Sequence, residues 1–142
     1  MSDLYGTYLI SLDKTGRIRL PKTVATAFGK SGALCYGDGI FLELYPEKEW
    51  KNLTAKFRKN DEPWDRKITL PLTHRTESRV DIQLDKKSRI TIPESHREYA
   101  ELKPGEDVVL TGALTHLRLW TPEQYEKFKR RRSLELLSLS YR

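Results

Sequence analysis

The chain has 142 residues, enough for one compact domain or two very small ones and too few for a large multidomain enzyme. Hydrophobic residues make up 37% of it and charged residues 32%, and the formal net charge of +6 favours polyanionic partners such as nucleic acid. The single cysteine, Cys35, excludes an intramolecular disulfide, and three scattered histidines lack the spacing of a zinc site. We therefore expect a small interior, or a second core shared between subunits, with no structural metal and no cofactor.

The first predicted element is a strand–loop–strand unit over residues 10–21 (ISLDKTGRIRLP). Apolar and polar side chains alternate on both sides of its loop, which is typical of half-buried strands. Pro21 ends the second strand because proline cannot donate to a strand ladder. The inward set is Ile10, Leu12, Ile18 and Leu20, and the outward set is Ser11, Arg17 and Arg19.

The loop between these two strands needs an adaptable backbone. Gly16 takes a positive φ at no steric cost, and the Asp13 carboxylate has the reach to accept hydrogen bonds from the amides of the turn. We predict a rigid loop that holds Arg17 outward.

The rest of the first half is predicted to mix helices and strands. A short helical pattern at residues 22–28 precedes two apolar strands, Leu34–Tyr36 and Ile40–Tyr45, which the pair Asp38-Gly39 joins as a hairpin. Pro46 and the acidic residues after it then begin a helix.

A polar, turn-rich stretch at residues 60–67 follows the first half, and Trp64 is expected to anchor it. Residues 68–79 carry conflicting signals, since three apolar residues alternate like an edge strand whereas Pro71 limits their pairing. Their conformation therefore has no assignment from sequence. The predicted organisation is half-unit 1 at residues 1–60, a linker at 61–79 and half-unit 2 at 80–142.

The second half repeats the first. Residues 82–93 (IQLDKKSRITIP) match residues 10–21 in the same order of aspartate, arginine, alternating triplet and proline. Ser88 stands where the first loop has Gly16; it costs about 1 kcal/mol if the turn is left-handed, and otherwise indicates a slightly different turn. The later elements recur as strands Val108–Thr111 and Leu114–Trp120 and a helix that begins at Pro122.

The C-terminal run Tyr125–Arg142 has helical spacing, with basic residues in its middle and leucines after them. For the basic run Lys129–Arg132 we favour a solvated face over phosphate contacts. The leucines are expected to dock on their own domain or on a neighbouring subunit; they are Leu134, Leu136, Leu137 and Leu139.

The two loop arginines, Arg17 and Arg89, carry the functional prediction. A planar guanidinium held outward beside a buried neighbour suits bidentate contacts to guanine or to phosphate. The alternative is that each arginine only pairs with the aspartate of its own loop as a surface salt bridge. Because the same acid, base and proline recur in both halves, we favour the functional interpretation. The surrounding residues expected to contact the DNA backbone are Lys14, Arg19, Lys86 and Lys87.

The repeated pattern Asp-Lys-x-Gly/Ser-Arg, followed by an alternating triplet and proline, resembles the MraZ family of bacterial transcription regulators. Other similar segments are residues 5–8 (YGTY), 97–100 (REYA), 109–112 (VLTG) and 119–120 (LW). The resemblance implies an α+β fold of two pseudo-symmetric AbrB-like half-units that form a swapped-hairpin β-barrel with flanking helices. It also implies that Arg17 and Arg89 contact DNA. Three features depart from the pattern: Ser88 stands where a glycine is expected, residues 22–28 lack the arginine that the second half has at Arg97, and no Arg-rich helical stretch precedes Val80.

The function that the resemblance implies is binding to double-stranded DNA at promoter repeats of the division and cell-wall gene cluster. The protein would act as a homo-oligomer, a ring of subunits, in the cytoplasm at the nucleoid. No catalytic constellation is visible and no stretch is long and apolar enough to span a bilayer, so we expect neither an enzyme, a small-molecule substrate nor a membrane partner. Two alternatives stay open: a ring-forming assembly protein without specific DNA binding, and another AbrB-like transition-state or antitoxin regulator.

Overall fold

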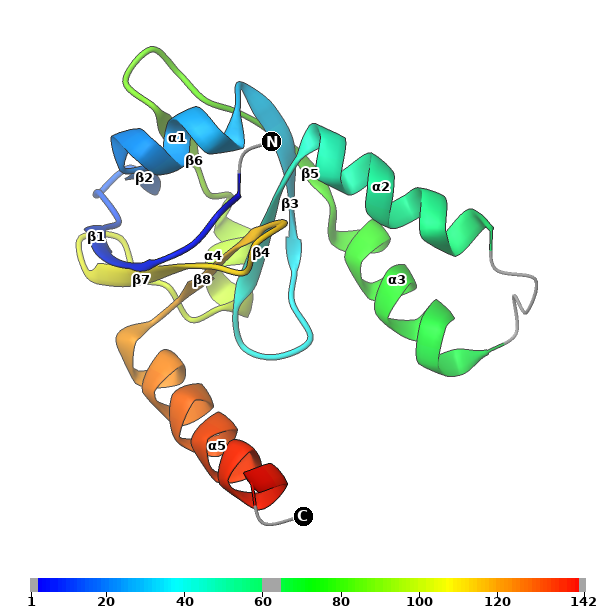
Figure 1. Ribbon diagram of the computed structural model, residues 1–142. Helices are drawn as coiled ribbons and strands as arrows, with labels where there is room; N and C mark the ends of the chain where they lie inside the picture. The colour runs from blue at the N-terminus through cyan, green and yellow to red at the C-terminus, as the bar shows by residue number, and fades with distance from the viewer. Residues whose placement is uncertain (1–2, 60–64, 141–142) are drawn as a thin grey trace.

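Eight strands and five helices make up the part of the chain that the structure, a computed structural model, describes: residues 3–59 and 65–140 (Figure 1). The strands are β1 (Thr7–Ser11), β2 (Arg17–Arg19), β3 (Ser31–Tyr36), β4 (Leu42–Pro46), β5 (Val80–Gln83), β6 (Arg89–Thr91), β7 (Asp107–Gly112) and β8 (Leu117–Trp120). The helices are α1 (Lys22–Phe28), α2 (Glu47–Arg58), α3 (Arg66–Ser78), α4 (Glu94–Tyr99) and α5 (Pro122–Ser140). Both halves thus share the order strand, strand, short helix, strand, strand, helix, and the α+β class is confirmed.

Strands of one half pair with strands of the other. β1 lies antiparallel to β7, β5 to β3, and β4 to β8, which makes one six-stranded sheet in the order β1-β7-β8-β4-β3-β5. The remaining two strands, β2 and β6, pair with each other in a separate two-stranded ribbon. Neither half therefore holds a complete sheet of its own.

The β-barrel that the resemblance implies is not closed in the structure. Within the described residues, the six-stranded sheet is open between β1 and β5, and the β2–β6 ribbon forms a second sheet instead of closing the first. The ribbon strands have only three residues each, and Pro21 and Pro93, which follow them closely, lack the amide donor that a longer ladder would need.

Apolar side chains pack on both faces of the six-stranded sheet, because successive strand residues point to opposite sides. One face packs into the main core, which takes residues from both halves. The first half contributes Leu44 and Ile18, and the second contributes Leu119 and Ile90. The other face is covered by α2 and by α5, in two smaller clusters. These clusters are Ala33, Cys35, Tyr45 and Trp50 under α2, and Phe41, Val109 and Trp120 with Tyr125 and Phe128 under α5.

The predicted alternation in the repeated segments is confirmed. The inward residues after each loop are fully buried, whereas Arg17 and Arg89 are half-buried and Arg19 is exposed. The buried residues that hold these segments are Leu12, Ile18, Leu20, Ile82, Ile90 and Ile92.

Residues 66–78, within the predicted linker, form helix α3. Asp65 begins the helix, because its carboxylate accepts a hydrogen bond from the backbone N–H of Lys67 at 3.0 Å. Pro71 lies inside the helix without ending it. The sequence shows no Arg-rich stretch before Val80, yet the residues there do form a helix, α3, whose arginines are Arg66 and Arg75. Trp64, expected to anchor the linker, lies outside the described residues.

Helices α2 and α3 lie side by side on one flank of the sheet, and α5 extends away from it (Figure 1). The first turns of α5 pack on Trp120, whereas residues 130–140 are exposed. The leucines of this helix therefore do not dock on their own domain. They are Leu134, Leu136, Leu137 and Leu139, each between 54% and 64% exposed.

Candidate nucleic-acid interface

One carboxylate fastens the loop between β1 and β2. Asp13 Oδ1 accepts hydrogen bonds from the backbone N–H of Thr15 (2.9 Å), from the Thr15 hydroxyl (2.7 Å) and from the backbone N–H of Arg17 (2.9 Å). Its second oxygen, Oδ2, accepts from Arg17 Nε at 3.2 Å. Gly16 completes the turn with a φ of 84°. The same side chain thus fixes both the turn and the direction of the arginine.

The loop between β5 and β6 is built the same way. Asp85 Oδ1 accepts from the backbone N–H groups of Lys87 (2.9 Å) and Arg89 (2.8 Å), and Oδ2 accepts from Arg89 Nε at 2.8 Å. Ser88 has a φ of 60°, so this turn is left-handed like the first, at a cost of about 1 kcal/mol for a residue with a Cβ. The sequence repeat therefore encodes two copies of one loop.

Hydrogen bonds keep both loop carboxylates ionised. The Thr15 hydroxyl and then the backbone amide of Arg17 lower the pKa of Asp13 to about 2. At Asp85 the backbone amide of Arg89 leads in lowering the carboxyl pKa. Both aspartates are thus charged at neutral pH and hold their arginines throughout the physiological range.

The ion pair that the sequence offers as an alternative is formed in both loops, through the Nε atoms of Arg17 and Arg89. Within the described residues, the Nη1 and Nη2 groups of Arg17 and Arg89 donate no hydrogen bond to another protein group, since both side chains bond through Nε. The two side chains remain 34% and 30% exposed. A guanidinium held through Nε keeps its terminal amino groups for a ligand, so pairing with aspartate and contact with a nucleic acid are compatible.

The β2–β6 ribbon brings the two loops onto one surface. Ile18 pairs with Ile90 on its buried side, and Arg19 pairs with Arg89 on the opposite side. Arg17, which pairs with Thr91, shares the side of Arg19 because residues two apart in a strand point the same way. Three arginines from two distant parts of the sequence therefore form one basic surface, which we call the ribbon surface (Arg17, Arg19 and Arg89).

The predicted lysines lie at the two ends of the ribbon surface. Lys14 is exposed in the first loop, and Lys86 and Lys87 are exposed in the second. Lys22 was not singled out from the sequence, yet it lines a shallow pocket together with Arg19, Lys86 and Lys87. Its position one residue after the proline that ends the strand is the signal that could have found it.

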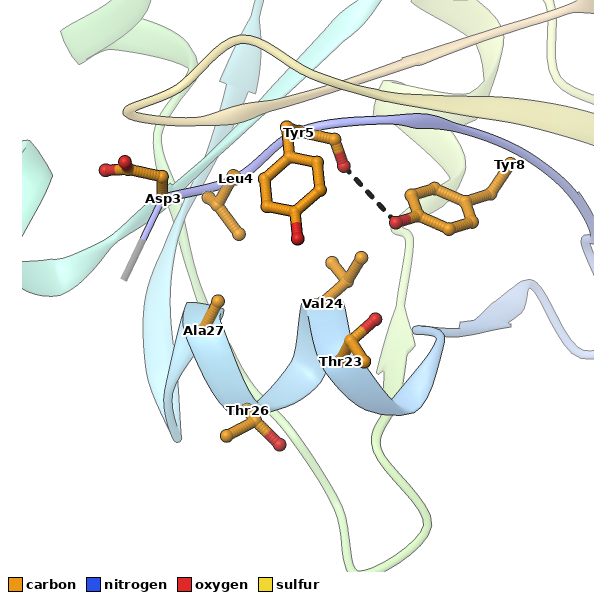
Figure 2. Close-up of a pocket in the computed structure, with 8 residues that line it drawn as sticks. All are labelled: Asp3, Leu4, Tyr5, Tyr8, Thr23, Val24, Thr26 and Ala27. Atoms are coloured by element: carbon orange, nitrogen blue, oxygen red, sulfur yellow. Dashed lines mark hydrogen bonds between the residues drawn. The ribbon is translucent and has the colours of Figure 1, made fainter. Parts of the chain in front are cut away.

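A different small cavity, of about 200 Å³, lies between the N-terminal segment and α1 (Figure 2). Threonine, tyrosine and aliphatic side chains line most of it, and Asp3 is its one acidic residue. The Tyr8 hydroxyl donates to the Tyr5 carbonyl at 3.3 Å.

Within residues 3–59 and 65–140, Cys35 and the metal-ligating residue types form no further reactive site. Cys35 is buried as expected, and burial raises the pKa of its thiol to about 12, which leaves it an inert thiol. In those two ranges no group of three or more His, Cys, Asp or Glu side chains could hold a metal ion. Over the same part of the chain, no helix has the length and apolarity needed to cross a membrane.

A buried ion pair escaped the sequence analysis. Glu43 on β4 is 1% exposed and accepts from Arg75 Nε of α3 at 2.6 Å and from Arg75 Nη2 at 3.3 Å. Burial alone would raise the Glu43 pKa, but His116 and Arg75 outweigh it and lower the pKa to about 2. The signal was one acidic residue inside an apolar strand. This pair attaches α3 to the sheet and lies on elements other than the ribbon.

The chain matches the family model described as "MraZ protein, putative antitoxin-like" over residues 4–71 and 77–138. Similar proteins named "Transcriptional regulator MraZ" occur in Thermoanaerobacter sp. strain X514, at 30% identity over 88% of this chain and 85% of that protein, and in Acetivibrio thermocellus, at 30% over 87% and 85%. A third, from Dictyoglomus thermophilum, is 29% identical over 91% of this chain and 86% of its own. These are names of regulators rather than of enzymes, which agrees with the expectation that the chain is not an enzyme. Two matched segments in tandem, together with relatives that cover most of the sequence, show that the chain belongs to the MraZ family.

Proposed function

We propose that the protein is a sequence-specific double-stranded DNA-binding regulator of transcription, in which Arg17 and Arg89 read base edges. The observation that carries this proposal is the ribbon surface, where both arginines are held by their own aspartates on the side opposite the buried Ile18–Ile90 pair. A two-stranded ribbon fits the major groove of B-DNA, and bidentate contact to guanine O6 and N7 is the commonest specific contact of arginine.

The remaining basic residues supply contacts to the DNA backbone. Such contacts are independent of sequence, and they fix the register of the protein on the duplex. The residues proposed for this role are Lys14, Arg19, Lys86 and Lys87.

The relatives' name supports a role in transcription, and the family resemblance extends the proposal to promoter repeats of the division and cell-wall gene cluster. A regulator bound there acts in the cytoplasm at the nucleoid. The AbrB-like description of the two half-units belongs to the same proposal, and the exchange of strands between the halves supports it.

Assembly into a ring of identical subunits is part of the proposal. The leucine-bearing end of α5 is exposed and extends from the body (Figure 1), which supports its use as a contact between copies. One ribbon surface offers few contacts, so several subunits on spaced repeats would gain affinity through multivalency.

The test replaces Arg17 and Arg89 by alanine, singly and together, and measures binding to duplexes selected from a random pool. Each substitution should weaken specific binding by about 1 to 3 kcal/mol and relax the preferred base at one position. Arg58→Ala, on an exposed residue of α2, is the matched control and should bind like the unaltered chain. Undiminished specific binding by the double variant would refute the assignment, and failure of the unaltered chain to bind any duplex would favour an assembly protein.

A further inference from the structure

We infer that a shallow groove beside the second loop binds a phosphate of the DNA backbone, and that the first loop has no equivalent groove. The inference rests on the proposed function and adds a subsite to it. It makes the two ends of the ribbon unequal, although the halves are built from one repeated sequence.

The groove has a volume of about 490 Å³ and joins residues from both halves. Its apolar part comes from the β1–β2 region and from Pro21, and Ser88 adds a hydroxyl. The cationic side chains that line it are Arg19, Lys22, Lys86 and Lys87. No acidic residue is among the residues that line it, so its charge is uncompensated within the groove.

Backbone contacts hold the two walls of the groove together. Arg19 Nε donates to the Lys87 carbonyl at 2.9 Å, and the backbone N–H of Leu20 donates to the Ser88 carbonyl at 2.9 Å. These bonds tie the second loop to β2, so the cations converge on a preformed surface. Lysine ammonium groups on such a surface suit phosphate oxygens as point charges.

The sequence repeat shows which residues occupy the equivalent positions at the first loop, and most of them differ from the groove residues in charge. Lys22 corresponds to Glu94, Arg19 to Thr91 and Lys87 to Thr15. Only Lys86 keeps its charge, as Lys14. Four cations at one end thus correspond to one cation and one carboxylate at the other.

The first loop is also covered where the second is open. Arg97 Nη1 donates to the Ile92 carbonyl at 2.6 Å and lies against Gly16, in the place that a Cβ at this position would need. In the repeat, Ala25 occupies the position of Arg97, so the first half has no long side chain there to cover Ser88. The arginine missing from residues 22–28 therefore leaves the second loop open, and the groove lies beside it.

The experiment measures how binding to a random-sequence duplex depends on salt. Log K falls as log salt rises, and each lost phosphate contact makes this slope shallower by about 0.9. Lys22 is the informative residue because it is exposed and belongs to the groove alone. Lys22→Gln should make the slope shallower by about 0.9. Lys22→Arg keeps the charge and should have the same slope as the unaltered chain. Lys51→Gln changes the net charge equally on exposed α2 and should leave the slope unchanged.

Three outcomes decide the matter. A shallower slope for Lys22→Gln, with no change for Lys51→Gln, supports the subsite. Equal slopes for Lys22→Gln and the unaltered chain, or equal losses in Lys22→Gln and Lys51→Gln, overturn it while DNA binding by the unaltered chain still stands. A chain that binds no duplex at any salt concentration refutes the proposed function itself, so the two failures are distinguishable.

Discussion

Arg19 and Arg89 face each other across the β2–β6 ribbon, on the side that the buried Ile18–Ile90 pair leaves outside the core. Like charges directly opposite each other in adjacent strands destabilise a sheet. A polyanion on this surface would remove the repulsion, so the pairing is costly for the free protein and favourable for a DNA-bound one. Each of the two arginines is also held separately, Arg19 by the Lys87 carbonyl and Arg89 by Asp85.

These two arginines should respond differently to replacement by lysine. A base-reading arginine needs its planar fork, whereas a phosphate contact needs only charge. Arg89→Lys is therefore expected to weaken binding to the preferred sequence by about 1 to 3 kcal/mol, and Arg19→Lys to leave sequence preference intact. Parallel titrations of preferred and random duplexes check this, and equal loss of specificity in both variants would contradict the division of roles.

The two turns should respond oppositely to exchange of glycine and serine. Ser88→Gly relieves a left-handed backbone at a residue with a Cβ, and should raise the free energy of unfolding by about 1 kcal/mol. Gly16→Ser should lower it by at least as much, because the added Cβ would also displace the Arg97 side chain. Chemical denaturation of both variants tests this; a stabilising Gly16→Ser would show that the φ values do not govern the turns.

Removal of Arg75 should destabilise the fold more than removal of a surface arginine. Arg75→Ala leaves the Glu43 carboxylate buried without its main partner, which costs about 3 to 5 kcal/mol. Arg79→Ala is the control, since Arg79 pairs with the more exposed Glu47 and Asp81 and should cost about 1 kcal/mol or less. Urea unfolding gives both values. In the double variant Arg75→Leu with Glu43→Leu, much of the loss should disappear, because the uncompensated charge is gone.

Acid should weaken the same attachment. Glu43 has a folded-state pKa of about 2 against an ordinary value of 4.5, so the ionised carboxylate stabilises the folded state. This contribution is complete above about pH 5 and is lost as pH falls towards 2. Glu43→Gln lacks it, so the difference in unfolding free energy between the two proteins should narrow over that range. A difference that stays constant from pH 7 to about pH 2 would show that the Glu43 pKa is not lowered by folding.

Polar substitutions on α5 should dissociate the proposed assembly. Leu134→Gln with Leu137→Gln removes apolar surface from one side of the helix, since the two residues are three apart. Sedimentation should show a smaller particle with unchanged helical content. Ser138→Gln, at an exposed position on the same helix, is the control. Unaltered chains that sediment as monomers at every concentration would contradict the ring.

The repeated segment predicted much of the fold, because its period of two places buried and outward residues unambiguously. Leu12, Ile18 and Ile90 are buried as predicted. Strand pairing depends on contacts between distant segments, which a local pattern does not record, and for that reason the sequence did not predict that the six-stranded sheet stays open. Helix α3 was missed because the apolar residues around Pro71 alternate as in a strand, and because proline inside a segment argues against a helix. The helix start at Asp65 was not identified from the sequence.

The candidate site was predictable to a similar degree. The repeat pointed to Arg17 and Arg89, and the structure places them in equivalent loops, each paired with the aspartate that the alternative interpretation named. Their shared surface with Arg19 depends on the β2–β6 pairing, which no local signal records. Glu43 and Arg75 were missed because their contact joins a strand of the first half to a helix beyond it.

The strand exchange sets the time at which this protein can fold. Ser11 in β1 contacts Asp107 in β7, 96 residues further along the chain. A ribosome must therefore translate the chain through β7 before β1 meets its neighbour, and the growing chain meanwhile exposes unpaired strand edges. Chaperones that shield nascent chains would act on those edges during synthesis.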